Sequence, residues 1–164
     1  MYAMPKSTIL LALIVVLFFS CTREPVKPVV NNGIFLNEVA AKGSDWLEIY
    51  NAGTTAVNVG GMYLTDSLAN PFKYRIPETD AARTTIQPGK YLVFFADEQG
   101  SQGILHANFR LNQLGEELGL FYIDGRTIDT RKFSLQNSDQ SEGRSPDGGS
   151  GWKKMTPTPG LKNN

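Results

Sequence analysis

No recognisable motif places a nucleophile beside a general base in this chain of 164 residues. His106 is the only histidine, and it lies in the stretch GILHANFRL with no partner motif beside it. No serine occupies a G-x-S-x-G turn, and no glycine-rich stretch carries the Lys-Ser/Thr pair of a phosphate-binding loop. The sequence therefore predicts no catalytic residue, no cofactor and no enzymatic activity. The alternative is a hydrolase that uses His106 and a carboxylate.

Acidic residues are the second group with a possible chemical role. Calcium takes about six to eight oxygen ligands, so acidic residues that meet at one end of a sandwich would suit it. The spacing D-x-D-x-D-G of a calcium loop is absent, and zinc would require Cys and His ligands. We therefore expect no metal, and interpret the acids as turn caps and ion-pair partners. The main calcium candidates are Asp45, Glu48 and Asp66. Asp97 and Glu98 are two further candidates.

Cys21 is the only cysteine, and its position predicts a lipid anchor. It follows Lys6 and an unbroken apolar run of 11 residues, Ile9 to Phe19. A membrane-spanning helix needs about 20 apolar residues, whereas the apolar region of a signal peptide needs about 7–15. The stretch Leu17-Phe18-Phe19-Ser20-Cys21 resembles the lipobox of bacterial lipoproteins, in which the cysteine is lipidated and becomes the mature N-terminus. The alternative is an ordinary signal peptide with an incidental cysteine.

Composition bounds the rest of the chain. Lys+Arg and Asp+Glu both number 16, so the net charge is zero and argues against nucleic acid as a partner. The segment after Cys21, TREPVKPVVNNG, has two prolines and no helical period, as is typical of an extended linker. We predict a lipoprotein signal peptide over residues 1–20, the lipidated cysteine and linker over 21–33, and one domain over 34–164.

The pattern of that domain is almost entirely β. In residues 45–51, Leu47 and Ile49 share one face of a strand, and Trp46, Glu48 and Tyr50 share the other. Asp124-Gly125 is a strong hairpin signal, and the apolar run 90–96 predicts a central strand. No window has a helical period, so short strands divided by turn residues favour a β-sandwich or barrel. The predicted strands span 34–40, 45–51, 56–66, 72–77, 90–96, 117–124 and 126–133.

Seven stretches, in this order, resemble the lamin tail domain family in its bacterial form. They are LNEV (36–39), DWLEIYN (45–51), GGMYLTD (60–66), IQPGKYLVFFAD (86–97), ANFRLNQLGEELGLFYIDG (107–125), SEGRSPDG (141–148) and TPTPGLKN (156–163). Met62-Tyr63 replaces the Trp-Tyr that is usual before LTD. The resemblance covers the chain from about residue 34 to its end, and it implies an all-β, immunoglobulin-like β-sandwich.

The last 24 residues, 141–164, are too rich in Gly, Pro and Ser to predict regular structure. The resemblance nevertheless implies that they belong to the fold, as a structural clamp. Arg144 is a rigid five-donor group that needs acceptors, and we predict that it pairs with a carboxylate of the early strands, above all Glu48. Pro146-Asp147-Gly148 would set a turn beside it, and Trp152 would cover an open end of the core. The other acceptors on offer are Glu38, Asp45 and nearby carbonyl groups.

One further site concerns modification. Asp66-Ser67-Leu68 resembles the Asp-Ser/Thr-apolar acceptor at which some bacteria of the Bacteroidetes type attach O-glycans. Ser67 is therefore a candidate for O-glycosylation, if the source is such a bacterium.

Taken together, these features predict a non-catalytic protein of the bacterial cell envelope. Its partner would be the membrane, to which the lipid on Cys21 attaches it. We expect this to be the outer membrane, with the domain on either the surface or the periplasmic side. Its single domain would bind or scaffold an unknown protein or glycan. One alternative is a structural protein that associates with itself through a strand edge. Another is an accessory module that assists an exported hydrolase or nuclease.

Overall fold

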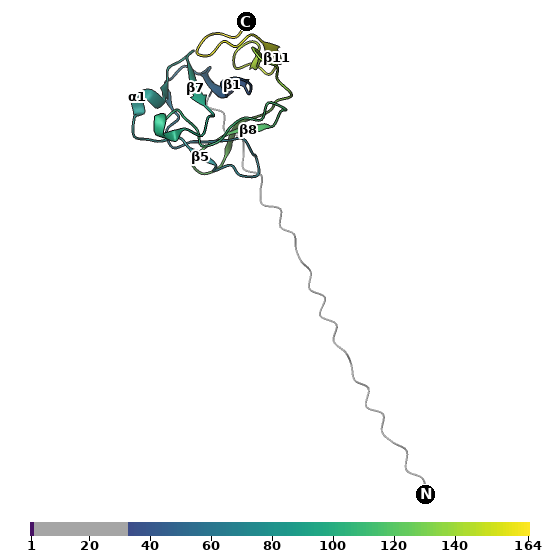
Figure 1. The fold of residues 1–164 in the computed structure, drawn as a ribbon. Coiled ribbons are helices and arrows are strands. Elements are labelled where there is room, and N and C mark those ends of the chain that lie inside the picture. Colours follow the sequence, from purple (N-terminus) through teal and green to yellow (C-terminus); the bar gives the residue numbers. More distant parts are fainter. Residues whose placement is uncertain (2–32) are drawn as a thin grey trace.

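The computed structural model describes Met1 and residues 33–164. The predicted signal peptide, lipidated cysteine and nearly all of the linker lie outside the described residues. Eleven strands, one short α-helix and one 3-10 turn follow Gly33 (Figure 1). The strands are β1 Ile34–Ala40, β2 Trp46–Asn51, β3 Val57–Asn58, β4 Tyr63–Thr65, β5 Tyr74–Arg75, β6 Thr85–Ile86, β7 Tyr91–Phe95, β8 Glu117–Phe121, β9 Thr127–Lys132, β10 Ser141–Arg144 and β11 Trp152–Met155.

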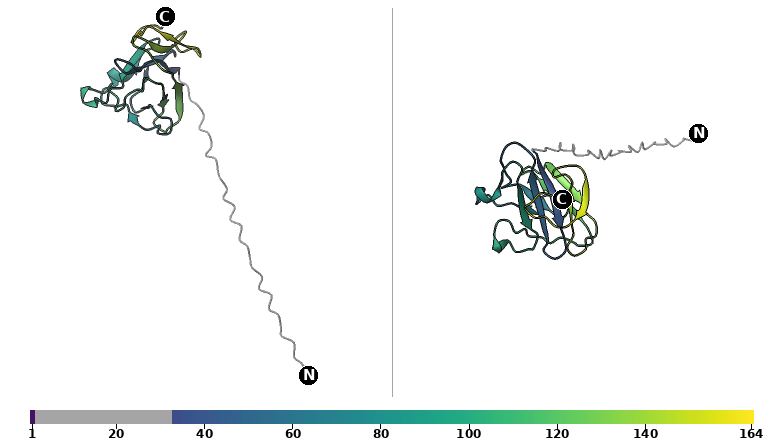
Figure 2. Two further views of the ribbon diagram at one scale, coloured as in Figure 1. Left: turned by 45° about the vertical axis from the view of Figure 1, so that its right-hand side comes forward. Right: turned by 90° about the horizontal axis from the view of Figure 1, so that it is seen from above.

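Two antiparallel sheets form an immunoglobulin-like β-sandwich. The larger has the order β11-β10-β1-β2-β7, the smaller β5-β4-β8-β9, and β3 pairs with β6 beside them. One core cluster joins both sheets, because Leu47 and Phe94 of the larger sheet belong to it together with Leu64 and Leu120 of the smaller. The right-hand view of Figure 2, which looks at the molecule from above, shows the strands of the larger sheet side by side. The predicted fold class is thus confirmed.

Several elements agree with the alternation of their residues. β1 coincides with the predicted strand 34–40, and β2 puts Leu47 and Ile49 into the core as expected. The hairpin of β8 and β9 turns at Asp124-Gly125, where Gly125 has φ +77°. That left-handed conformation suits glycine, which explains why the dipeptide is a reliable turn signal.

Other elements differ from the sequence prediction. β7 was predicted to be central, but it is the edge strand of the larger sheet, and only Phe95 is bridged on its outer side, by His106. A short helix, α1 Ala81–Thr84, starts where the Asp80 side chain accepts a hydrogen bond from the Arg83 N–H. The glycine-rich end of the chain also contributes β10 and β11, which pair with each other, and β10 pairs with β1.

The sandwich has two distinct ends. β1 begins next to Gly33, where Ile34 pairs with Asn51, and finishes at Ala40, which pairs with Trp46. We call the end at Gly33 the entry end and the opposite one the far end. The far end consists of the loops over 41–45, 112–116 and 134–140, because the Ala41 N–H and the Gln113 carbonyl both bond to Gln136.

Candidate functional site

A β-bulge in β1 positions two buried glutamates opposite each other. Leu36 pairs with Ile49 and Glu38 pairs with Glu48, so Asn37 is an extra residue in the ladder. The bulge allows Leu36 and Val39 both to face the core, although they are three positions apart and a regular strand would place them on opposite faces. It leaves Glu38 and Glu48 together on the outer face of the larger sheet.

The last segment of the chain, residues 156–164 and here called the tail, covers these glutamates. Figure 1 shows this yellow segment on the outer side of the larger sheet, away from β5 and β8. The Glu38 carboxylate accepts hydrogen bonds from the Thr158 N–H (3.0 Å) and the Thr158 hydroxyl (2.8 Å). The Ser141 hydroxyl also donates to it. The tail is therefore held by side chains of the sheet.

Glu48 is fully buried and is held by two N–H donors. Its Oε1 accepts from Asn37 Nδ2 at 3.0 Å, and its Oε2 accepts from the Gly160 N–H at 2.7 Å. Burial raises its pKa to about 7, although both hydrogen bonds lower it, and the nearby charges of Glu38 and Asp147 raise it further. A carboxyl that titrates near neutral pH therefore lies directly under the tail.

Asp147 links the loop after β10 to the sheet and to the tail. It accepts hydrogen bonds from Asn37 Nδ2 (3.0 Å), the Asn163 N–H (3.1 Å) and the Tyr91 hydroxyl (2.8 Å). Burial and the hydrogen bond to Asp147 raise the pKa of Tyr91. The turn predicted at this position is present, with the Gly149 N–H bonded to the Pro146 carbonyl at 2.8 Å.

Asn163 fastens the final residues of the tail. Its buried side chain donates from Nδ2 to the carbonyls of Arg144 (2.8 Å) and Asn37 (3.2 Å) and accepts from the Thr158 hydroxyl (3.0 Å). Beneath it, a Cβ on Gly143 would lie 2.7 Å from Asn163 Nδ2 and 2.6 Å from Met155 Sδ. Only a glycine leaves room for the tail there. These residues form the outer polar cluster: Asn37, Glu38, Glu48, Asp147, Thr158 and Asn163.

The sequence predicted that Arg144 pairs with Glu48, but in the structure Arg144 pairs with Asp129 instead. Its Nη2 lies 2.8 Å from Asp129 Oδ2, and its Nε donates to the Leu36 carbonyl at 2.7 Å. The register explains the error. Glu38 pairs with Gly143, so its neighbour Arg144 points to the opposite face from the two glutamates. Arg144 thus lies at the seam between the two sheets, and its Nη1 also donates to the Gly149 carbonyl.

Trp152 lies beside Arg144 at the open edge of the sandwich. It is half-buried against the core cluster, and its ring is 4.4 Å from the Arg131 guanidinium carbon and 4.9 Å from that of Arg144. Arg131 in turn pairs with Glu142 at 2.5 Å. Burial raises the pKa of Glu142, but the hydrogen bonds that it accepts from Arg131 and Ser134 together lower it by more. The pKa of Glu142 is therefore below its usual value.

The calcium candidates are not brought together. Asp45 accepts a hydrogen bond from the Leu111 N–H at 3.3 Å, Glu48 belongs to the outer polar cluster, and Asp66 pairs with Lys73 at 2.6 Å. Burial raises the pKa of Asp45. Within the described residues, no group of three or more potential metal ligands is present. Each carboxylate has a local partner, which leaves no shared site for the ion.

His106 has a partner that its sequence context did not indicate. Its Nδ1 lies 2.8 Å from Asp97 Oδ2, and its ring stacks on Phe95 with centroids 5.0 Å apart. Burial would raise the pKa of Asp97, but the hydrogen bonds from His106 and the Gln99 N–H lower it. In the described part of the chain, no hydroxyl or thiol hydrogen-bonds to this pair, so it lacks a nucleophile.

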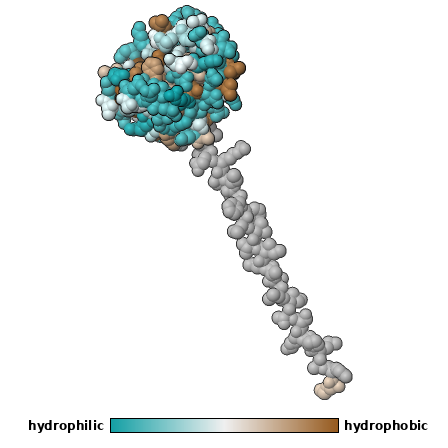
Figure 3. Space-filling model, in the orientation of Figure 1, coloured by the Kyte–Doolittle hydropathy of each residue, from teal (hydrophilic) through white to brown (hydrophobic). Residues whose placement is uncertain are grey.

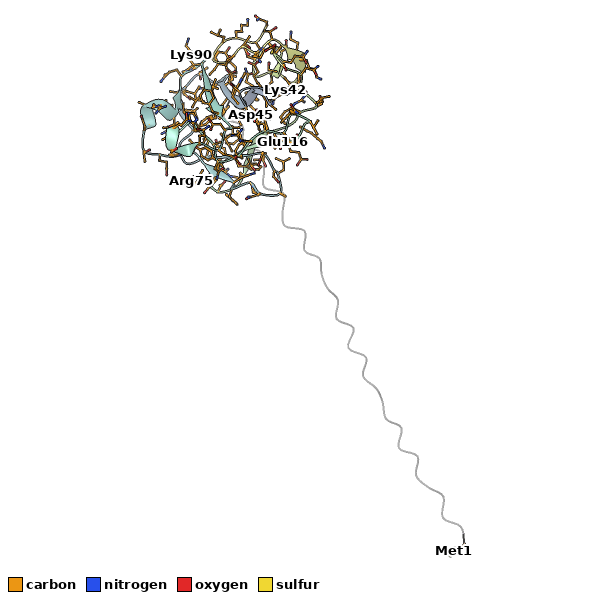
Figure 4. All side chains as sticks on the ribbon, viewed as in Figure 1. Met1, Lys42, Asp45, Arg75, Lys90 and Glu116 are labelled. Atoms are coloured by element: carbon orange, nitrogen blue, oxygen red, sulfur yellow. The ribbon has the colours of Figure 1, made fainter. Side chains whose placement is uncertain are left out.

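The surface of the domain is mainly polar, with few exposed apolar side chains. No pocket is present among the described residues. Figure 3 shows a mainly hydrophilic face with separate brown patches. In Figure 4, Lys90 and Arg75 lie toward the left of the domain, and Lys42, Asp45 and Glu116 lie to the right of them, so both charge signs occur across this view. Ser67 is half-buried in the turn after β4. No helix among the described residues has the length and apolar composition needed to cross a bilayer.

Comparison with known families identifies the domain. The family model of the Lamin Tail Domain matches residues 28–134, and the chain therefore belongs to this family of non-catalytic, immunoglobulin-like domains. No curated protein and no solved structure matches the chain. The match ends at Ser134, whereas β10, β11 and the tail complete the larger sheet and cover its outer face.

Sequence reasoning missed Asn37, Asp129 and Tyr91 as parts of these networks. Asn37 had a signal, because apolar residues at 36 and 39 of a single strand break the two-residue period and indicate a bulge. Asp129 and Tyr91 had none, because their partners are 15 and 56 positions away in the chain.

Proposed function

We propose that the protein is a non-catalytic, lipid-anchored module of a bacterial cell envelope, which binds a protein or glycan partner through the far end of its sandwich. The anchor would be Cys21, in the outer membrane. The family supports a β-sandwich module without its own chemistry. The lipobox-like stretch and the short linker support a domain held close to a membrane.

The observation that carries the proposal is the pair of exposed leucines at the far end. Leu114 is 68% exposed and Leu135 is 50% exposed. Their loops are neighbours, because the Gln136 N–H donates to the Gln113 carbonyl at 2.9 Å. Exposed apolar residues on adjacent loops are typical of an interaction surface. No pocket is present among the described residues, so a partner would contact these leucines on an open surface.

Two features support the absence of catalysis. The His106–Asp97 pair lacks a bonded nucleophile, and the buried carboxylates of the outer polar cluster are covered by the tail. A reaction at either place would first require the structure to open.

The experiment is protease accessibility on intact cells. If the domain is cut on whole cells, it faces the medium, and glycan and protein ligands there should be screened first. Protection until the envelope is broken would place it in the periplasm. The Cys21→Ala variant is the control for anchoring, and it should release the domain from the membrane fraction. Retention of that variant in the membrane would contradict the lipid anchor.

The partner surface is tested by photo-crosslinking. A photoreactive residue at position 135 should yield a cross-linked product in cells. The same residue at position 161 serves as the control, because Leu161 is also exposed but lies on the tail. Equal products from both positions, or none from 135, would contradict the far end as the binding surface.

A second candidate function is self-association through the edge of β7. The residues Tyr91–Phe95 include no charged side chain, whereas β11 at the other edge of the same sheet carries Lys153 and Lys154. Charged residues on edge strands normally prevent pairing between molecules. Light scattering would show a mass that rises with concentration, and Val93→Lys should abolish that rise. A constant monomer mass would rule this candidate out.

A further inference from the structure

Two large apolar side chains are also exposed at the entry end. Phe72, in the loop between β4 and β5, is 51% exposed, and Ile123, in the turn between β8 and β9, is 58% exposed. Their exposure is as large as that of the far-end leucines, yet they are at the opposite end of the sandwich. A partner bound at the far end does not account for them.

Phe72 and the β8–β9 turn are held together by direct packing. The Phe72 ring meets the Tyr63 ring edge to face, with centroids 5.0 Å apart. It also lies over Gly125, where an added Cβ would be 2.6 Å from Phe72 Cζ. Tyr63 pairs with Phe121, at the end of β8 that leads into the turn. We call the aromatic and apolar side chains of Phe72, its partner Tyr63 and the adjoining turn the entry rim: Tyr63, Phe72, Tyr122 and Ile123.

The entry rim is on the end at which the chain enters the domain. β9 runs beside β1 in the same direction, because Asp129 bonds to the Leu36 N–H (2.9 Å) and Gln136 bonds to the Ala41 N–H (2.7 Å). The turn before β9 and the residue before β1, Gly33, are consequently at the same end.

Charges around the entry rim are compensated in pairs. Arg75 pairs with Glu78 at 2.5 Å, Arg126 with Asp124 at 2.6 Å, and the Arg126 guanidinium lies 5.2 Å from the Tyr122 ring centre. Aromatic rings and long basic side chains both suit the boundary between lipid headgroups and acyl chains. The paired acids leave the rim without excess charge, so its attraction to lipid would come from apolar contact.

Chain length keeps this end near the anchor. Gly33 is twelve positions after Cys21, a span of about 40 Å if fully extended and of roughly 20 Å as a flexible chain. A tether of this length gives the rim a high effective concentration at the bilayer, so a weak contact suffices.

We propose that the entry rim rests on the membrane, with Phe72 and Ile123 inserted at the boundary between headgroups and acyl chains. The proposal rests on the lipid anchor of the proposed function. It fixes the orientation of the module, with the entry rim on the lipid and Leu114 and Leu135 directed away from it.

The test uses the full lipidated chain in vesicles of phosphatidylethanolamine and phosphatidylglycerol, with lipids brominated near the headgroup. The Phe72→Trp variant places a reporter in the rim, and Leu135→Trp is the matched control at the far end. Both share the background of Trp46 and Trp152. We expect the tryptophan at 72 to lose about half of its fluorescence, as for a residue at the interface, and the one at 135 to be unchanged.

The Ile123→Trp variant repeats the test without disturbing the packing of Phe72 on Gly125. Equal quenching at the rim and at 135, in protein that floats with the vesicles, would overturn the rim proposal and leave the anchor intact. Rim reporters shielded from both brominated lipid and aqueous acrylamide would indicate a second copy of the chain on the rim, which also overturns it. Protein that does not float with vesicles would refute the anchor, and the rim proposal with it.

Discussion

The Arg144 guanidinium and the Asp129 carboxylate meet 2.8 Å apart at the seam between the two sheets, directly over the bulge in β1. The N–H and the carbonyl of Leu36, the residue before the bulge, both bond to side chains. Asp129 accepts from that N–H at 2.9 Å, and Arg144 donates to that carbonyl at 2.7 Å. The ion pair thus satisfies two backbone groups of a buried residue that would otherwise lack partners.

Removal of Arg144 should destabilise the domain strongly. Arg144→Ala leaves the half-buried Asp129 carboxylate without its cation and the Leu36 carbonyl without its donor, and we expect a loss of about 3 kcal/mol in the free energy of unfolding. Urea denaturation measures the change. Arg110→Ala is the control, because its ion pair with Glu98 is exposed and should contribute at most about 1 kcal/mol. Unchanged stability of Arg144→Ala would show that the clamp has no energetic role.

Glu48 should make stability depend on pH near neutrality. Its folded-state pKa of about 7 exceeds its usual value of 4.5, so folding favours the protonated form. The corresponding stability is fully present below pH 4.5 and is lost as the pH rises through about 7. The loss should amount to about 3 kcal/mol. Glu142, whose pKa is lowered, titrates below this window.

Carboxyl carbon shifts in NMR, followed against pH, measure the Glu48 titration directly. In urea denaturation between pH 5 and 8, Glu48→Gln should remove the dependence, whereas Glu78→Gln, on the surface, should preserve it. A Glu48 midpoint near its ordinary value would contradict the prediction.

Gly143→Ala should loosen the tail. The new Cβ would lie within 2.7 Å of Asn163 Nδ2 and Met155 Sδ, and overpacking of this kind costs about 1–3 kcal/mol. Thermal unfolding and the rate of proteolysis in the tail report the effect. The matched control is Gly100→Ala, whose Cβ would meet only the His106 carbonyl at 3.8 Å. If both variants behave alike, the tail does not depend on the close contact.

Asn163→Asp should be costly, whereas Asn164→Asp should be neutral. The Asn163 amide donates to two buried carbonyls, and a carboxylate there would face both of them without a donor. We expect a loss of about 3 kcal/mol from the first variant and less than about 0.5 kcal/mol from its exposed neighbour. Differential scanning calorimetry compares the two. Similar melting temperatures would contradict the role assigned to the tail.

Calcium should leave the domain unaffected. Asp45, Glu48 and Asp66 each have a separate partner, so neither added calcium nor chelator should shift the melting temperature by more than about 1 °C, since a ligand stabilises only what it binds. A clear rise in melting temperature with calcium would show that other oxygen ligands converge.

Much of the sandwich follows from local sequence patterns. The alternation in β2 places Leu47 and Ile49 in the core, and Asp124-Gly125 turns the hairpin of β8 and β9. Such features depend on the two-residue period of a strand and on the φ preference of one glycine, both of which are local. β10 escaped prediction because its partner, β1, is about a hundred residues away in the chain, and its sequence, Ser-Glu-Gly-Arg, has no apolar residue that could show a two-residue period.

The sequence by itself determined the β architecture and the hairpin from residues close together in the chain, and the family from an ordered set of stretches along it. It also predicts the anchor at Cys21. Only the tertiary structure decided which carboxylate Arg144 meets. Charge made Glu48 and Asp129 equally suitable, but the pairing of Glu38 with Gly143 turns Arg144 to the inner face and leaves Glu48 on the outer one. Strand register and sheet order are properties of distant segments brought together, so they select partners that charge and spacing leave open.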